Sequence, residues 1–97
     1  MKTHFDNIKR YRAFHIRYNP PNNRHGARVR IMDNRQKMSI VIPYNHQYDN
    51  IWQIAIVHLL NLPEPIEISA MGMRRDEDHV LLTENFTTPI KQRNAKH

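Results

Sequence analysis

Apolar residues recur at every second position in several stretches of the chain, which is the pattern of β-strands with one buried face. The alternation covers residues 10–18, 27–32 and 37–43, and later residues 66–71 and 79–83. The first strand should end at the Asn-Pro-Pro sequence of residues 19–21, because proline cannot continue a ladder of hydrogen bonds. The second and third strands should pair as a hairpin around the polar turn at residues 33–36, where Asn34 can take a left-handed conformation.

The period changes to that of a helix between residues 48 and 62. Asp49 or Asn50 can cap its N-terminus, and Pro63 should end it. On a helical wheel, one broad apolar arc is expected to cover the sheet, formed by Ile51, Trp52, Ala55, Ile56, Leu59, Leu60 and Leu62. Ile54 and Val57 fall on the opposite, polar side of the wheel, so we expect them to face water.

The elements therefore follow in the order strand, strand, strand, helix, strand, strand. This order predicts the α+β class, with one helix packed on one face of a mostly antiparallel sheet and the other face open. A chain of 97 residues is expected to form a single domain, residues 1–97. Residues 91–97 are polar and should form a loose tail, because they have almost no apolar surface to bury.

Arginine occupies every second position of the second strand. If the helix covers the side that carries Val29 and Ile31, then Arg28 and Arg30 project from the open face. Like charges on adjacent strands repel one another, which favours an external negative partner, although a basic face can also serve solubility alone. The first strand, the loop after it and the third strand add basic groups. The candidate nucleic-acid-binding residues are His15, Arg17, Arg24, Arg28, Arg30 and Lys37.

The distribution of charge along the chain supports this interpretation. The net charge is +6, and residues 1–37 hold ten Lys or Arg against two Asp, so the rest of the chain is slightly acidic. Clustered basic residues create a field that attracts phosphate or an acidic protein surface. The expected partner is therefore nucleic acid or a nucleoprotein.

The sequence offers no sign of catalytic, metal or cofactor chemistry. There is no cysteine, and the seven histidines include no pair at the spacing of four residues that a helical metal site uses. Gly26 and Gly72 are the only glycines, so a glycine-rich phosphate loop is excluded. No apolar run approaches the length of a membrane span or a signal peptide, so we expect a cytoplasmic protein that is not an enzyme. Enzymatic activity would require histidines distant in sequence to meet in space.

Ile54 and Val57 suggest a second contact surface. Apolar groups on the polar side of a helix are typical of an interface, here either a symmetric homodimer or the C-terminal segment folded back over the helix. Isolated surface apolar residues are also common, and this alternative stays open.

Two resemblances bear on function. Three strands followed by a helix, over residues 10–62, resemble the sheet-based DNA-binding domains of plant ethylene-response factors and the arm-binding domains of phage integrases. This likeness implies DNA binding by Arg17, Arg28 and Arg30, although the strands here lack the tryptophan of those domains. The stretches "YNPPNNRHGARVRIMD", "SIVIPYNHQYDNI" and "HVLLTENFTTPIK" resemble short uncharacterised proteins of phages and bacterial mobile elements. That likeness implies a small binding protein.

The sequence thus favours a small non-enzymatic protein that binds nucleic acid through the basic open face of its sheet. The alternative is a phage or mobile-element accessory protein, such as an anti-CRISPR-like inhibitor, that binds a host protein or nucleoprotein complex.

Overall fold

A computed structural model describes residues 8–75 and 78–92 of the chain. Its elements are β1 (Arg12–Asn19), β2 (Arg28–Asp33), β3 (Met38–Pro43), α1 (Ile51–Leu60), β4 (Ala70–Arg75) and β5 (Asp78–Thr83). The strands form one sheet in the order β3-β2-β1-β5-β4, and every neighbouring pair is antiparallel. The predicted α+β class and the order of the elements are confirmed.

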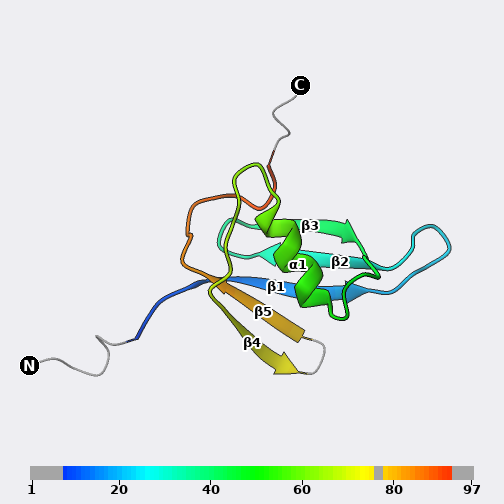
Figure 1. Cartoon of the computed structure of the whole chain (residues 1–97), viewed down its shortest axis with the longest axis horizontal. Helices are drawn as coiled ribbons and strands as arrows, with labels where there is room; N and C mark the ends of the chain where they lie inside the picture. The colour runs from blue at the N-terminus through cyan, green and yellow to red at the C-terminus, as the bar shows by residue number, and fades with distance from the viewer. Residues whose placement is uncertain (1–7, 76–77, 93–97) are drawn as a thin grey trace, which may run out of the picture.

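The helix lies on one face of the sheet, across β1 and β2 (Figure 1). The strands β5 and β4 extend beyond it, which leaves Met71 and Met73 of β4 exposed on the helix side. Among the described residues, no helix or strand packs on the other face.

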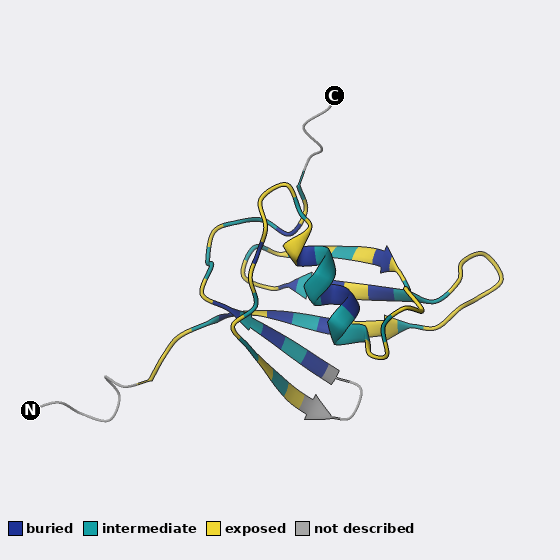
Figure 2. Cartoon of the chain, viewed as in Figure 1, coloured by how far each residue is buried: buried dark blue, intermediate teal, exposed yellow. Residues whose placement is uncertain are grey.

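Burial alternates along the strands as predicted (Figure 2). In β1, Phe14 and Ile16 are fully buried whereas Ala13 and Arg17 are exposed. In β2, Val29 and Ile31 are fully buried while Arg30 is exposed. The core between sheet and helix consists of Phe14, Ile16, Val29, Ile31, Ile42, Ile54, Ala55, Leu59, Ile66, Leu81 and Ile90.

The helix is shorter than predicted and has a defined start. The side-chain oxygen of Gln53 accepts hydrogen bonds from the backbone N–H groups of Asp49 and Asn50, each at 3.0 Å. At the other end, the N–H of Asn61 donates to the carbonyl of Val57 at 3.1 Å and so closes the last turn. The helix therefore spans ten residues rather than the whole range of apolar periodicity.

The predicted orientation of the helix is correct only in part, because Ala55 and Leu59 of the predicted arc are fully buried but the buried side also includes Ile54. Ile54 is only 5% exposed and belongs to the core, whereas Leu60, expected on the buried arc, is 43% exposed. Val57 is half-buried. The helix is apolar around most of its circumference, so the sequence alone does not fix which side faces the sheet. Because Ile54 is buried, it cannot form the partner surface that its predicted position suggested.

Two local predictions also need correction. The alternation at residues 66–71 does not begin a strand at Ile66, whose buried side chain enters the core and whose N–H donates to the carbonyl of Leu59 at 3.0 Å. The strand begins four residues later, at Ala70. In the turn between β2 and β3, Lys37 rather than Asn34 takes the left-handed conformation, with φ of 54°.

The segment after β5 is anchored further than predicted. Ile90 is buried, and the side chain of Gln92 accepts from the N–H of Glu64 and donates to the Glu64 carbonyl, both at 2.9 Å. Gln92 therefore does not belong to a loose tail. The remainder of the predicted tail, residues 93–97, lies outside the described residues.

Candidate nucleic-acid interface

The register of the sheet brings three arginines together on the open face. Arg17 of β1 lies directly opposite Arg30 of β2, and Arg28 lies two residues away from Arg30 on the same strand and the same face. Side chains directly opposite on antiparallel strands have Cβ atoms about 5 Å apart. We refer to Arg17, Arg28 and Arg30 as the arginine cluster.

The arginine cluster lacks counter-charges within the part of the chain that the structure describes. The ion pairs found there are Lys9–Glu84 and Arg12–Asp33, and neither includes a member of the cluster. Arg17 and Arg30 are exposed, and Arg28 is half-buried. The Nε of Arg28 is buried without a hydrogen-bond partner among these residues. Within residues 8–75 and 78–92, no described acidic side chain therefore balances the positive charge of the cluster.

Among the side chains that the structure describes, the rest of the open face is mainly apolar rather than basic. Half-buried His15 faces Met32 on one side and Val80 on the other. In the next row along β1, Ala13 faces Leu82. The arginine cluster thus occupies only the end of the face nearest the β1–β2 loop, and His15 lies at the border between the two regions.

Arg24 lies in the β1–β2 loop, which projects past that same end of the sheet (Figure 1). The side-chain oxygen of Asn22 accepts from the N–H groups of Arg24, at 2.9 Å, and His25, at 2.8 Å. The N–H of Asn22 also donates to the carbonyl of His25 at 2.8 Å. These bonds close a compact turn that presents exposed Arg24 beyond the strands.

Lys37 lies apart from the other candidate residues. It follows the turn after β2, whereas Arg28 begins that strand, and the length of β2 separates the two by about 17 Å. Lys37 is exposed, but the structure does not place it in the arginine cluster.

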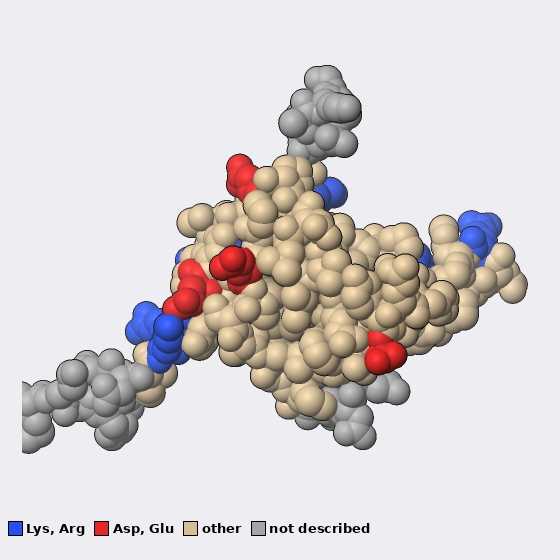
Figure 3. All heavy atoms as spheres, in the orientation of Figure 1, with Lys and Arg blue, Asp and Glu red and all other residues tan. Residues whose placement is uncertain are grey.

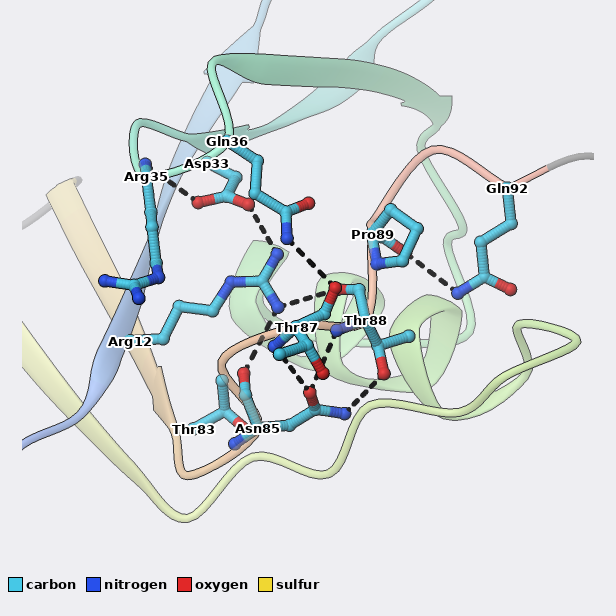
Figure 4. Close-up of polar contacts among 10 residues, drawn as sticks. All are labelled: Arg12, Asp33, Arg35, Gln36, Thr83, Asn85, Thr87, Thr88, Pro89 and Gln92. Atoms are coloured by element: carbon cyan, nitrogen blue, oxygen red, sulfur yellow. Dashed lines mark hydrogen bonds and ion pairs between the residues drawn. The ribbon is translucent and has the colours of Figure 1, made fainter.

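Arg12 does not contribute to the basic surface, contrary to the count of charges along the sequence. Its side chain is fully buried, where it forms an ion pair with Asp33 at 2.5 Å and donates to the carbonyls of Thr88 at 2.6 Å and Asn85 at 3.2 Å (Figure 4). Arg12, Phe14 and Ile16 are spaced two residues apart along β1 and therefore lie on the same, buried face of the sheet. This spacing is visible in the sequence.

The helix side of the molecule carries scattered acidic groups, whereas Lys and Arg are visible there only towards its edges, at the two ends of the long axis and near the C-terminal end (Figure 3). A phosphate backbone would find few basic groups on this side.

An aromatic cluster that sequence reasoning missed lies next to α1. The ring of Tyr44, just after β3, contacts Tyr18 edge-on with centroids 5.9 Å apart and His46 with centroids 4.9 Å apart. An open groove of about 810 Å³ runs between this cluster, Tyr48 and the helix residue His58. Burial lowers the pKa of His58 below its ordinary value of 6.5. Two features of the sequence pointed towards this cluster. Tyr18 lies on the same face of β1 as Phe14 and Ile16, and Tyr44 follows directly after Pro43, where β3 ends.

The described residues include no group of three or more potential metal ligands. They also include no helix long and apolar enough to cross a membrane. Comparison with protein-family models, with curated proteins and with solved structures returns no match for this chain.

Proposed function

We propose that this protein binds the phosphate backbone of nucleic acid with its arginine cluster. One observation supports this most directly: Arg17 and Arg30 lie opposite each other on an open sheet face, without an acidic partner among the described residues. Such a pair is destabilising by itself, so a bound anion would relieve the repulsion. One guanidinium group can donate two hydrogen bonds to the oxygens of a phosphate. Guanidinium groups on neighbouring strands also lie close enough together to bind the same phosphate backbone.

The arrangement favours phosphate contacts over the reading of bases. A sheet face carrying three arginines and Asn19 beside Arg28 can contact several phosphates of one backbone. No Phe, Tyr or Trp occupies the open face of the described strands, so the aromatic surface there for stacking of bases is limited to the half-buried ring of His15. Arg24 on the projecting loop would extend the contact along the nucleic acid.

The test is a titration with fluorescein-labelled duplex DNA and single-stranded RNA, followed by fluorescence anisotropy. Three phosphate contacts predict a slope of log affinity against log salt of about −3. The double variant Arg17→Gln/Arg30→Gln should reduce that slope by about 2 and abolish binding at about 150 mM salt.

Arg10→Gln provides the matched control. Arg10 is exposed and precedes β1, about 23 Å along the strand direction from Arg17, so the loss of one charge there should leave the slope nearly unchanged, whereas the single variant Arg17→Gln should reduce it by about 1. If the wild-type protein binds neither nucleic acid at about 50 mM salt, where electrostatic binding is strong, the proposal is wrong. Equal losses in Arg10→Gln and Arg17→Gln would show a nonspecific effect of net charge.

A further inference from the structure

The strand β3 forms one edge of the sheet, and its outer backbone groups are unpaired within the described part of the chain. The N–H of Tyr44 donates to the carbonyl of Ala27 at 3.0 Å, which extends the β2–β3 ladder by one pair. Because backbone direction alternates along a strand, the N–H groups of Ser39 and Val41 point away from β2. They form the outer edge.

The two edges of the sheet differ in their protection. The other edge strand, β4, contains Gly72 and a shift of register between Met73 and Arg75, and such irregularities discourage pairing with a further strand. The register of β3 with β2 is unbroken, and β3 carries no lysine. Only Pro43, at its end, lacks an N–H to offer.

Two adjoining hollows lie at the C-terminal half of β3. On the helix side lies the groove of about 810 Å³, which Ile42, Val57 and His58 help to line. A second hollow of about 480 Å³ shares Ile42, Pro43, Tyr44 and His46 with that groove and adds Arg28 and Val41, whose side chains belong to the open side of the sheet. Successive side chains of an added strand point to opposite faces, so they would lie in turn beside the groove on the helix side and beside Val41 and Arg28 on the open side.

The two hollows differ in chemistry. The helix-side groove is lined by apolar and aromatic groups, by uncharged side-chain amides and by two histidines, His46 and His58. The second hollow contains the cationic Arg28, whose Nε is buried without a hydrogen-bond partner among the described residues, together with His25. Neither hollow includes an acidic residue in its lining. A complementary strand would therefore alternate apolar and acidic side chains.

We propose that the edge of β3 binds an extended segment of a partner protein in which apolar and acidic residues alternate, by addition of a strand to the sheet. Backbone hydrogen bonds to Ser39 and Val41 supply the affinity, and the hollows select the side chains. This surface is distinct from that of the proposed nucleic-acid binding, with which it shares only Arg28.

The probe is a fluorescein-labelled heptapeptide of alternating valine and glutamate, measured by fluorescence anisotropy at about 150 mM salt, near physiological ionic strength. A heptapeptide of alternating valine and lysine is the charge-reversed control. The glutamate peptide should bind at least about tenfold more tightly, because only it can pair with Arg28. Arg28→Gln should remove most of that preference.

Val41→Pro tests the mode of binding. Proline removes the outward N–H and leaves the ladder to β2 intact, a position that edge strands tolerate. This variant should weaken the glutamate peptide about tenfold, whereas Val41→Thr, which keeps the N–H, should bind like the wild type. Circular dichroism checks that both variants are folded, and Arg28→Gln remains a separate test if Val41→Pro is not.

Three results would overturn the proposal. The first is the absence of binding of the glutamate peptide at about 1 mM, the weak end of measurable affinity. The second is equal binding of both peptides by the wild type. The third is a wild-type dimer in sedimentation that Val41→Pro converts to a monomer, because the edge would then be occupied by a second copy of the chain. If the wild-type protein binds the glutamate peptide but does not bind nucleic acid, only the function proposed above is contradicted.

Discussion

The guanidinium of Arg12 lies 2.5 Å from the carboxylate of Asp33, and neither side chain reaches solvent. The same guanidinium donates to the carbonyls of Asn85 and Thr88, while Asp33 also accepts from the N–H of Arg35 at 3.1 Å (Figure 4). One buried cation thus joins β1, the end of β2 and the segment that follows β5. Charges so deeply buried are tolerated only when they are paired and hydrogen-bonded.

Removal of one partner should therefore be costly. Asp33→Ala leaves the Arg12 guanidinium buried without its counter-charge, and we expect the free energy of unfolding to fall by about 3 to 5 kcal/mol. Urea denaturation followed by circular dichroism measures the loss. Glu84→Ala is the control, because the Lys9–Glu84 pair that it breaks is well exposed and should matter little. A comparable loss in both variants would contradict the argument from burial.

The arginine cluster should destabilise the free protein. Arg30→Glu replaces a pair of like charges, Arg17 and Arg30, with a pair of opposite charges at the same cross-strand position. Stability should rise by about 0.5 kcal/mol, and the melting temperature with it, while affinity for nucleic acid falls. Differential scanning calorimetry tests the first effect. A large drop in melting temperature would mean that Arg30 stabilises the fold instead.

Ile54 and Val57 should respond unequally to truncation. Ile54→Ala opens a cavity in the core and should cost about 3 kcal/mol. Val57→Ala removes a half-buried side chain beside an open groove and should cost less than about 1 kcal/mol. Urea denaturation of the two variants compares them directly. Equal losses would imply that both residues are buried to the same degree in solution.

Stability should decline as the solution becomes acidic, and His58 should contribute to the decline. Burial lowers the pKa of His58 in the folded protein below its ordinary value of 6.5, so the unfolded chain binds this proton more readily. The contribution of His58 is complete above pH 6.5 and is lost as the pH falls below that value towards the lowered pKa. His58→Gln should therefore flatten the dependence of unfolding free energy on pH between pH 7.5 and pH 5, a range of about one to two units around the ordinary pKa. An unchanged slope would contradict this.

The sequence was informative wherever alternation was strong. It predicted which side chains of β1 and β2 point towards the helix, and therefore that Arg17 lies on the sheet face that points away from the helix. It misjudged α1, because an almost uniformly apolar helix has no preferred buried side until the sheet provides one. The orientation of Ile54 is therefore a tertiary property.

The polar features of the structure were harder to predict. The alternation of Phe14 and Ile16 indicates that Arg12 is buried, but nothing local identifies Thr88 as its acceptor. The open edge of β3 and its two hollows depend on the order of strands in the sheet, which pairing rules leave undetermined. Contacts between segments that are distant in the sequence could not be predicted for the same reason.

The ties between the two ends of the chain also affect how the protein is made. The hydrogen bond from Arg12 to Thr88 spans 76 residues, and Ile90 completes the core that Phe14 begins. Closing such long loops is the slow part of folding. A ribosome must therefore synthesise the chain at least as far as Ile90 before the core around β1 is complete, so the first strand waits for a segment made much later.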